Sequence, residues 1–251
     1  TLAGHARLVV ARNAAALLAK HPGRTVVGDW TGSLSDEGDD VVLLDARGNS
    51  ADEVTYGRHL RWPERADQGG SSLELRDLRA DNAQPEAWAA SDTSHLGQWE
   101  TITYTEVAAN DGLGNDAFRD FLLGMLDAGE VLVDDVSVRE NPTGTNVEFI
   151  QNGSFEGDAP GSVPQFWRCI GNHGQGRSTV VVDPDDPGNK CLRIVATGPT
   201  DDKHNRIETT FLTGRSVVVG RTYRVSLRMR WMGGSNQVNT RLYFNYLQRT
   251  T

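Results

Sequence analysis

Two short β-like segments carry carboxylates, and oxygen ligands of this kind can bind a divalent cation. Residues 129–138 (Gly-Glu-Val-Leu-Val-Asp-Asp-Val-Ser-Val) carry Asp134 and Asp135, and residues 151–156 (Gln-Asn-Gly-Ser-Phe-Glu) carry Glu156. Ca²⁺ takes about six to eight oxygen ligands from carboxylates, backbone carbonyls and water. These carboxylates are therefore the first candidates for a site.

Strand alternation decides which of these side chains share a face, because successive side chains of a strand point to opposite faces. A carboxylate that faces a core is costly unless it is paired or bound to a metal. Alternatively, Asp134 and Asp135 cap backbone amides or pair with arginine. Alternation predicts one face with Leu132, Asp134, Val136 and Val138, and the opposite face with Val133, Asp135 and Ser137.

No motif for catalysis stands out. The six histidines form neither His-x-x-x-His nor His-Glu-x-x-His, and there is no Gly-x-Ser-x-Gly, phosphate loop or Rossmann fingerprint. A glycosidase needs two carboxylates at a set separation. With 34 acidic residues in the chain, any such pair would be arbitrary. We therefore expect no enzymatic activity.

Length and composition limit the classes of protein and partner. At 251 residues the chain is long enough for two domains with separate cores. Its formal net charge of −9 disfavours nucleic-acid binding, which needs a basic face. No apolar run reaches membrane-spanning length, so the sequence predicts no membrane insertion.

The two cysteines, Cys169 and Cys191, each lie in a β-like run. Two thiols cannot form a zinc site unaided, and no Cys-x-x-Cys is present. A cross-strand disulfide in an oxidising compartment is one interpretation. Two buried free thiols that pack as small apolar groups are the other.

The elements that would position these residues are almost all strands. One helix is predicted over 14–20, because Asn13 can cap this alanine-rich segment and Pro22-Gly23 ends it. Residues 80–98 are polar and aperiodic, which predicts a linker between domains. A hairpin is predicted from 40–45 and 52–56. Further strands are expected at 72–75, 100–107, 121–127, 130–138, 148–152, 166–170, 178–182, 191–196, 206–211, 222–231 and 239–246.

Short strands, frequent glycine turns and little helix predict an all-β protein built from sandwiches. One segment is ambiguous, because apolar residues over 116–125 also recur at helical spacing. We favour a strand that begins after Arg119.

Residues 2–92 resemble the lamin tail domain in its bacterial form. The similarity rests, in chain order, on 30–38 (Trp-Thr-Gly-Ser-Leu-Ser-Asp-Glu-Gly), the predicted hairpin, Trp62-Pro63, 67–75 (Asp-Gln-Gly-Gly-Ser-Ser-Leu-Glu-Leu) and Trp88. The resemblance implies an immunoglobulin-like β-sandwich over 1–94. The family usually begins with further strands that have no counterpart here. Their lack would leave an open sheet edge, for residues before Thr1 or another chain to fill.

Residues 98–251 are similar to the galactose-binding-like jelly rolls of carbohydrate-binding modules, which implies a second domain over 95–251. The opening strand of that family matches 152–156, and its middle strands match 192–196 and 222–230. Its closing strands match 99–107 and 129–138, which here precede the opening strand. Two truncated jelly rolls or one circularly permuted jelly roll would explain this order. We favour the permuted one, because neither piece alone has enough strands to bury both faces of a sandwich.

The jelly-roll resemblance implies two kinds of site. The family often holds a structural Ca²⁺ between its opening and closing strands, and the matching ligands are Asp134 or Asp135, the Ser154 carbonyl and Glu156. A sugar site would need exposed aromatic platforms beside polar groups. The candidates, each of which has a core position as its alternative, are Trp167, Trp231, Tyr243 and Tyr246, with Asn172, Asn236 and Arg241 beside them.

These expectations favour a non-catalytic binding or adhesion module of a larger bacterial protein, secreted or on the cell surface. Its expected partner is a polysaccharide or a cell-surface protein. One alternative is a structural or assembly protein whose β domains pack into a multimeric envelope or filament, with self-association through an open sheet edge. A second is an accessory piece of a secreted hydrolase. A shared fold does not by itself establish any of these functions.

Overall fold

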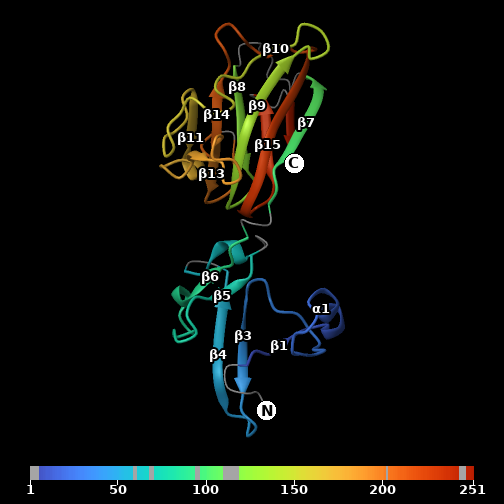
Figure 1. The fold of residues 1–251 in the computed structure, drawn as a ribbon, viewed down its shortest axis with the longest axis vertical. Helices are drawn as coiled ribbons and strands as arrows, with labels where there is room; N and C mark the ends of the chain where they lie inside the picture. The colour runs from blue at the N-terminus through green and yellow to red at the C-terminus, as the bar shows by residue number, and fades with distance from the viewer. Residues whose placement is uncertain are drawn as a thin grey trace. The chain divides into compact units, whose positions relative to one another are not determined.

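The computed structural model describes residues 6–58, 61–67, 71–93, 97–109, 119–201, 203–242 and 247–251. The chain forms two compact units, Thr1–Gly57 and Arg58–Thr251 (Figure 1). Strands are the main regular element of both units, as the sequence predicts. Among the described residues, no helix has the length and apolar character that crossing a bilayer requires.

The first unit contains one helix and two small sheets. Asn13 caps the helix by accepting a hydrogen bond from the Ala16 N–H at 2.8 Å, and the helix ends before Pro22-Gly23, so this prediction is confirmed. The first two strands pair in parallel, with the helix as their connection. The elements are β1 (Val9–Val10), α1 (Ala14–Lys20), β2 (Val26–Val27), β3 (Gly38–Leu44) and β4 (Ser50–Gly57).

The predicted hairpin is present as β3 and β4, which pair antiparallel. Asp45 holds the turn, because its Oδ1 accepts hydrogen bonds from the N–H groups of Arg47 and Asn49. No other described strand pairs with this two-stranded sheet. In addition, no side chain between residues 6 and 57 is fully buried.

The second unit contains the remaining strands. Its first antiparallel pair, β5 (Leu73–Leu75) and β6 (Trp88–Ala90), shows that part of the predicted linker is a strand. The sequence placed the domain boundary at residue 94, whereas these two strands belong to the second unit. The other strands are β7 (Glu100–Val107), β8 (Asp120–Met125), β9 (Gly129–Glu140), β10 (Val147–Glu148), β11 (Trp167–Ile170), β12 (Thr179–Val182), β13 (Lys190–Ala196), β14 (Arg206–Thr210), β15 (Thr222–Gly234), β16 (Val238–Leu242) and β17 (Leu247–Thr250).

Two sheets face each other in this unit. The six-stranded sheet has the order β12-β13-β9-β15-β7, with β10 paired to β9, and the five-stranded sheet has the order β11-β14-β8-β16-β17. Three short 3₁₀ helices, η1 (Glu64–Ala66), η2 (Pro85–Ala87) and η3 (Gly171–His173), lie in the connections. Strand β8 begins at Asp120, so the choice of a strand after Arg119 is confirmed.

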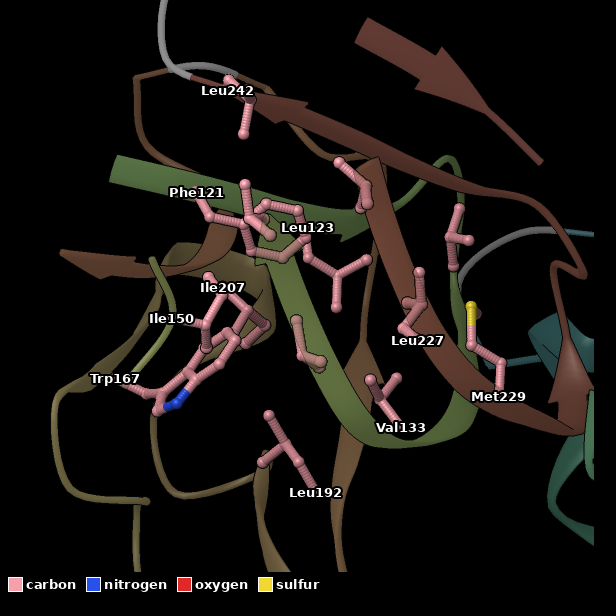
Figure 2. Packing of buried hydrophobic residues seen from close by; sticks show 14 of the residues in the cluster. Phe121, Leu123, Val133, Ile150, Trp167, Leu192, Ile207, Leu227, Met229 and Leu242 are labelled. Atoms are coloured by element: carbon pink, nitrogen blue, oxygen red, sulfur yellow. The ribbon is translucent and has the colours of Figure 1, made fainter. Parts of the chain in front are cut away.

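One hydrophobic core fills the space between the two sheets (Figure 2). It contains Val133 and Val138 from β9 together with Phe149 and Phe155, which come after the bend at Asn141. The segments on both sides of that bend therefore share a single core, as expected for one sandwich rather than two truncated ones. The rings of Phe155 and Trp167 pack at a centroid distance of 5.4 Å.

The predicted alternation of side chains along β9 is wrong at one point, because the strand contains a β-bulge. The pairing of β9 with β15 shifts register between Ser226 and Arg228, opposite Asp135, whose φ is +50°. The extra residue reverses the facing of the strand. As a result, Val133 and Val136 both point into the core, whereas strict alternation would place them on opposite faces.

Candidate functional site

A cavity of about 410 Å³ opens between the two sheets of the second unit and contains one of the predicted aromatic residues, Trp231. Its apolar wall comes from both sheets. The members of this wall, besides Trp231, are Ile102, Met125, Val131, Met229 and Val238. The cavity therefore continues the row of core side chains toward the surface.

The position of Trp231 follows from its strand. In β15 the side chains of Leu227 and Met229 point into the core, so alternation places Trp231 on the same inner side, opposite Val131. A register shift follows immediately, between Trp231 and Gly233. The indole Nε1–H donates a hydrogen bond to the Gly234 carbonyl at 3.1 Å, which fixes the ring orientation.

The polar part of the cavity comes from two connections and the start of β7. Gln98 and Glu100 contribute an amide and a carboxylate, and Ser235 and Asn236 contribute a hydroxyl and an amide from the turn after β15. The Ser235 N–H donates to the carbonyl of Ala128, the residue before β9, at 2.9 Å, so this turn is fixed to the start of that strand. The cavity therefore combines an apolar wall with side chains that can donate and accept hydrogen bonds.

Of the other predicted ligand residues, those that the structure describes do not line this cavity. Trp167 is in the core, and its Nε1–H donates to the carbonyls of Gln151 and Asn152, so its ring is not a surface platform. The side-chain amide of Asn172 donates a hydrogen bond to the Pro199 carbonyl at 3.0 Å and so connects two loops. Arg241 is buried. Tyr243 and Tyr246 lie outside the described residues.

The predicted cation ligands lie near the start of β13 but are bonded to protein donors. Asp134 is only 1% exposed. Its Oδ1 accepts from the Asp135 N–H at 2.7 Å, and its Oδ2 accepts from Asn189 Nδ2 at 3.0 Å. Burial raises the pKa of Asp134 in spite of these hydrogen bonds. Arg228 lies 3.5 Å from both Asp134 and Asp135, which is the pairing that the sequence left open.

Glu156 is bonded to Lys190, which follows Asn189 and is the first residue of β13. Its Oε1 accepts a hydrogen bond from the Lys190 N–H at 2.9 Å. The Lys190 ammonium donates to the carbonyls of Glu156 at 2.6 Å and Asp158 at 2.8 Å. Asp134 and Glu156 thus bind the neighbouring residues Asn189 and Lys190. Within the described residues, no group of three or more histidine, cysteine, aspartate or glutamate side chains could hold a metal ion, and calcium binding stays a prediction.

A further carboxylate of this cluster, Asp183, was not among the predicted cation ligands. Its Oδ2 accepts from Asn189 Nδ2 at 3.1 Å, and its Oδ1 accepts from Trp99 Nε1 at 3.2 Å. Burial raises the pKa of Asp183, but hydrogen bonds from Asp185, Asn189 and Trp99 outweigh it and lower the pKa overall. Arg228 lies 4.8 Å from the centre of the Trp99 ring, a cation–π contact.

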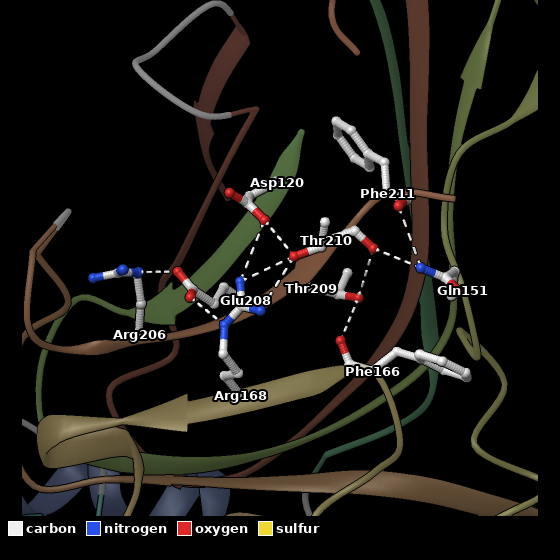
Figure 3. A network of polar contacts seen from close by, with 9 residues as sticks. All are labelled: Asp120, Gln151, Phe166, Arg168, Arg206, Glu208, Thr209, Thr210 and Phe211. Carbon is white, nitrogen blue, oxygen red and sulfur yellow. Dashed lines mark hydrogen bonds and ion pairs between the residues drawn. The ribbon is translucent and has the colours of Figure 1, made fainter. Parts of the chain in front are cut away.

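The outer face of the five-stranded sheet carries a separate polar network (Figure 3). Glu208, on β14, is buried and accepts hydrogen bonds from Nε of Arg168 and Nε of Arg206. Asp120 accepts from the Thr210 hydroxyl at 2.8 Å and lies 3.3 Å from Arg168. These charges neutralise one another, which is typical of a structural network.

The two cysteines are free thiols in the structure. Cys169 belongs to β11 and Cys191 to β13, which are strands of opposite sheets. Burial raises the pKa of each thiol to about 12. Both are therefore protonated at neutral pH and have little reactivity.

Comparison with known proteins gives no match that could indicate a function. No family model, no curated protein and no solved structure matches this chain.

Proposed function

We propose that the chain is a non-catalytic binding module of a larger extracellular bacterial protein, and that the cavity at Trp231 is its carbohydrate-binding site. The supporting observation is that the Trp231 indole lines the same cavity as the side chains of Gln98, Glu100 and Asn236. Aromatic rings bind the apolar faces of sugar rings, while amides and carboxylates bind their hydroxyls.

The chemistry of the cavity favours binding over catalysis. Glu100 is the one ionisable side chain among the described residues that line it. Acid hydrolysis of a glycosidic bond ordinarily uses a pair of carboxylates. Glu100 instead serves this proposal as a hydrogen-bond acceptor for a sugar hydroxyl.

The resemblances in the sequence support the same proposal. A lamin-tail-like first domain beside a jelly roll like those of carbohydrate-binding modules suits a secreted or surface protein that attaches to polysaccharide. If the chain is an accessory part of a secreted hydrolase, it would bind carbohydrate through the same cavity. The two proposals differ only in whether a hydrolase domain belongs to the same protein.

A glycan array followed by calorimetric titration of the glycans it selects tests the proposal. Trp231→Ala should weaken binding by about tenfold, equivalent to ~1.4 kcal/mol, because the stacking surface is lost. Glu100→Gln, at an exposed position that should not disturb folding, should also weaken it. The matched control is Phe166→Ala, at an aromatic residue that is 58% exposed away from the cavity. Absence of binding to every glycan, or equal binding by all three variants, would contradict the proposal.

A further inference from the structure

The β3–β4 hairpin exposes four consecutive apolar side chains. Val41, Val42, Leu43 and Leu44 are between 45% and 64% exposed. Alternation places Val41 and Leu43 on one face of the hairpin and Val42 and Leu44 on the other. Neither face is therefore covered as it would be inside a sandwich.

A two-stranded hairpin is at best marginally stable in water without a further strand or layer. The outer edge of β3 pairs with no other described strand. An unpaired edge with apolar side chains and no proline is a template for another strand. The hairpin thus has the features of an acceptor for β-strand addition.

The charge of the hairpin indicates what kind of strand it accepts. Residues 38–57 contain five acidic residues and a single basic one, Arg47. Asp39 and Asp40, which immediately precede the apolar run, accept hydrogen bonds from neutral donors: the Ser35 N–H at 3.3 Å and the Thr55 hydroxyl at 2.5 Å. A second copy of the hairpin would bring like charges together, which is unfavourable.

We propose that β3 is a docking edge for an extended segment of another polypeptide in which apolar residues alternate with lysine or arginine. The added strand hydrogen-bonds to the free edge of β3. Its apolar side chains pack beside Val41 and Leu43, and its cations lie near the carboxylates of the hairpin. The proposal is independent of the carbohydrate site, which belongs to the other unit.

The test uses the full chain and short synthetic peptides measured by fluorescence anisotropy. The probe is a peptide in which valine alternates with lysine. One comparison peptide replaces the lysines by glutamate, and another carries a central proline that prevents strand pairing. Only the uninterrupted basic peptide should bind, and hydrogen exchange of the β3 amides should slow when it does. Equal binding of the proline peptide would show charge attraction alone and would overturn the proposal.

A matched pair of variants locates the edge. Leu43→Lys places a cation on the docking edge and should weaken peptide binding by about tenfold or more. Leu78→Lys makes the same change at a leucine that is 84% exposed in the other unit, and it should leave binding unchanged. Equal effects of the two variants would overturn the proposal. So would a dimer in light scattering that Leu43→Lys dissociates, because the occupant would then be a second copy.

Discussion

At the scale of single residues, burial decides what an ionisable or aromatic side chain does here. Trp167 and Trp231 have the same side chain, but one lies in the core and the other borders a cavity. His173 is fully buried, and its Nε2 accepts a hydrogen bond from the Met125 N–H at 2.9 Å. Its Nδ1 lies 2.5 Å from Asn172 Oδ1, so Nδ1 carries the hydrogen. The imidazole is therefore held in its neutral form.

We predict that His173 makes the stability of the protein pH-dependent. Burial lowers the pKa of His173 to about 4 from its ordinary 6.5. The unfolded chain therefore takes up a proton first as the pH falls. The stabilisation is complete above pH 6.5 and is lost between pH 6.5 and about 4, by roughly 3 kcal/mol.

Urea unfolding of the natural protein and of His173→Gln across this pH range measures the effect. Glutamine keeps an acceptor but does not titrate, so the variant should lose less stability than the natural protein as the pH falls. Carboxylates titrate in both proteins, which is why the difference between the two curves is the informative quantity. Parallel curves would count against the prediction.

Lys190 lies beside Glu156, one of the predicted calcium ligands, and we predict that it stabilises this part of the fold. Lys190→Met removes the ammonium that donates to the carbonyls of Glu156 and Asp158 and should lower the free energy of unfolding by about 1–2 kcal/mol. Lys203→Met, at an exposed lysine, is the control and should have little effect. The predicted calcium site is tested directly by adding calcium to the unmodified protein. A higher melting temperature supports the calcium prediction, and no change at millimolar concentration contradicts it.

At the scale of elements, the strand β9 determines how the second unit is built. It pairs with β13 on one side and with β15 on the other, and after the bend β10 pairs antiparallel with its last residues. The bulge at Asp135 turns the strand so that its valines face the core both before and after it. The same bulge places Asp134 where Asn189 and Arg228 can reach it.

We predict that the bulge tolerates only residues that accept a positive φ. Asp135 has φ of +50°, a region open to glycine, asparagine and aspartate but strained for β-branched residues. Asp135→Val should destabilise the protein by about 1–2 kcal/mol, whereas Asp135→Asn should change stability little. Chemical denaturation compares the two. The prediction fails if valine and asparagine give the same midpoint.

At the scale of the whole molecule, the two units differ in how much apolar surface they bury. The second unit has a continuous core of buried side chains from both sheets. The first has no fully buried side chain over residues 6–57. Because burial of apolar surface is the main stabilising contribution to folding, the first unit should open far more easily.

Hydrogen exchange on the intact chain measures this difference. Amides of β9 and β15, which lie inside the six-stranded sheet, should exchange slowest of all. Amides of β3 and β4 should exchange orders of magnitude faster, through local opening of the hairpin. Equal protection of β3 and β9 would mean that the first unit is stabilised by contacts other than those of a core.

The sequence by itself determined the positions of most strands, the capped helix and the β3–β4 hairpin. These features follow from local rules: side-chain alternation, Asn13 before an alanine-rich segment, and glycine turns. The sequence also put Trp231 and Asn236 among the candidates for a sugar site. It could not show that they meet Gln98 and Glu100, which are more than a hundred residues away in the chain.

Only the tertiary structure decided which strands pair, where the bulge falls and which tryptophan reaches the cavity. These features depend on pairings between distant segments, such as β7 with β15 and β13 with β9. A single extra residue in a strand reverses every side chain after it, and no local pattern around Asp135 marks that residue. The polar network of Asp183 and Asn189 could not be predicted for the same reason, because its partners Trp99 and Asp134 come from distant parts of the chain.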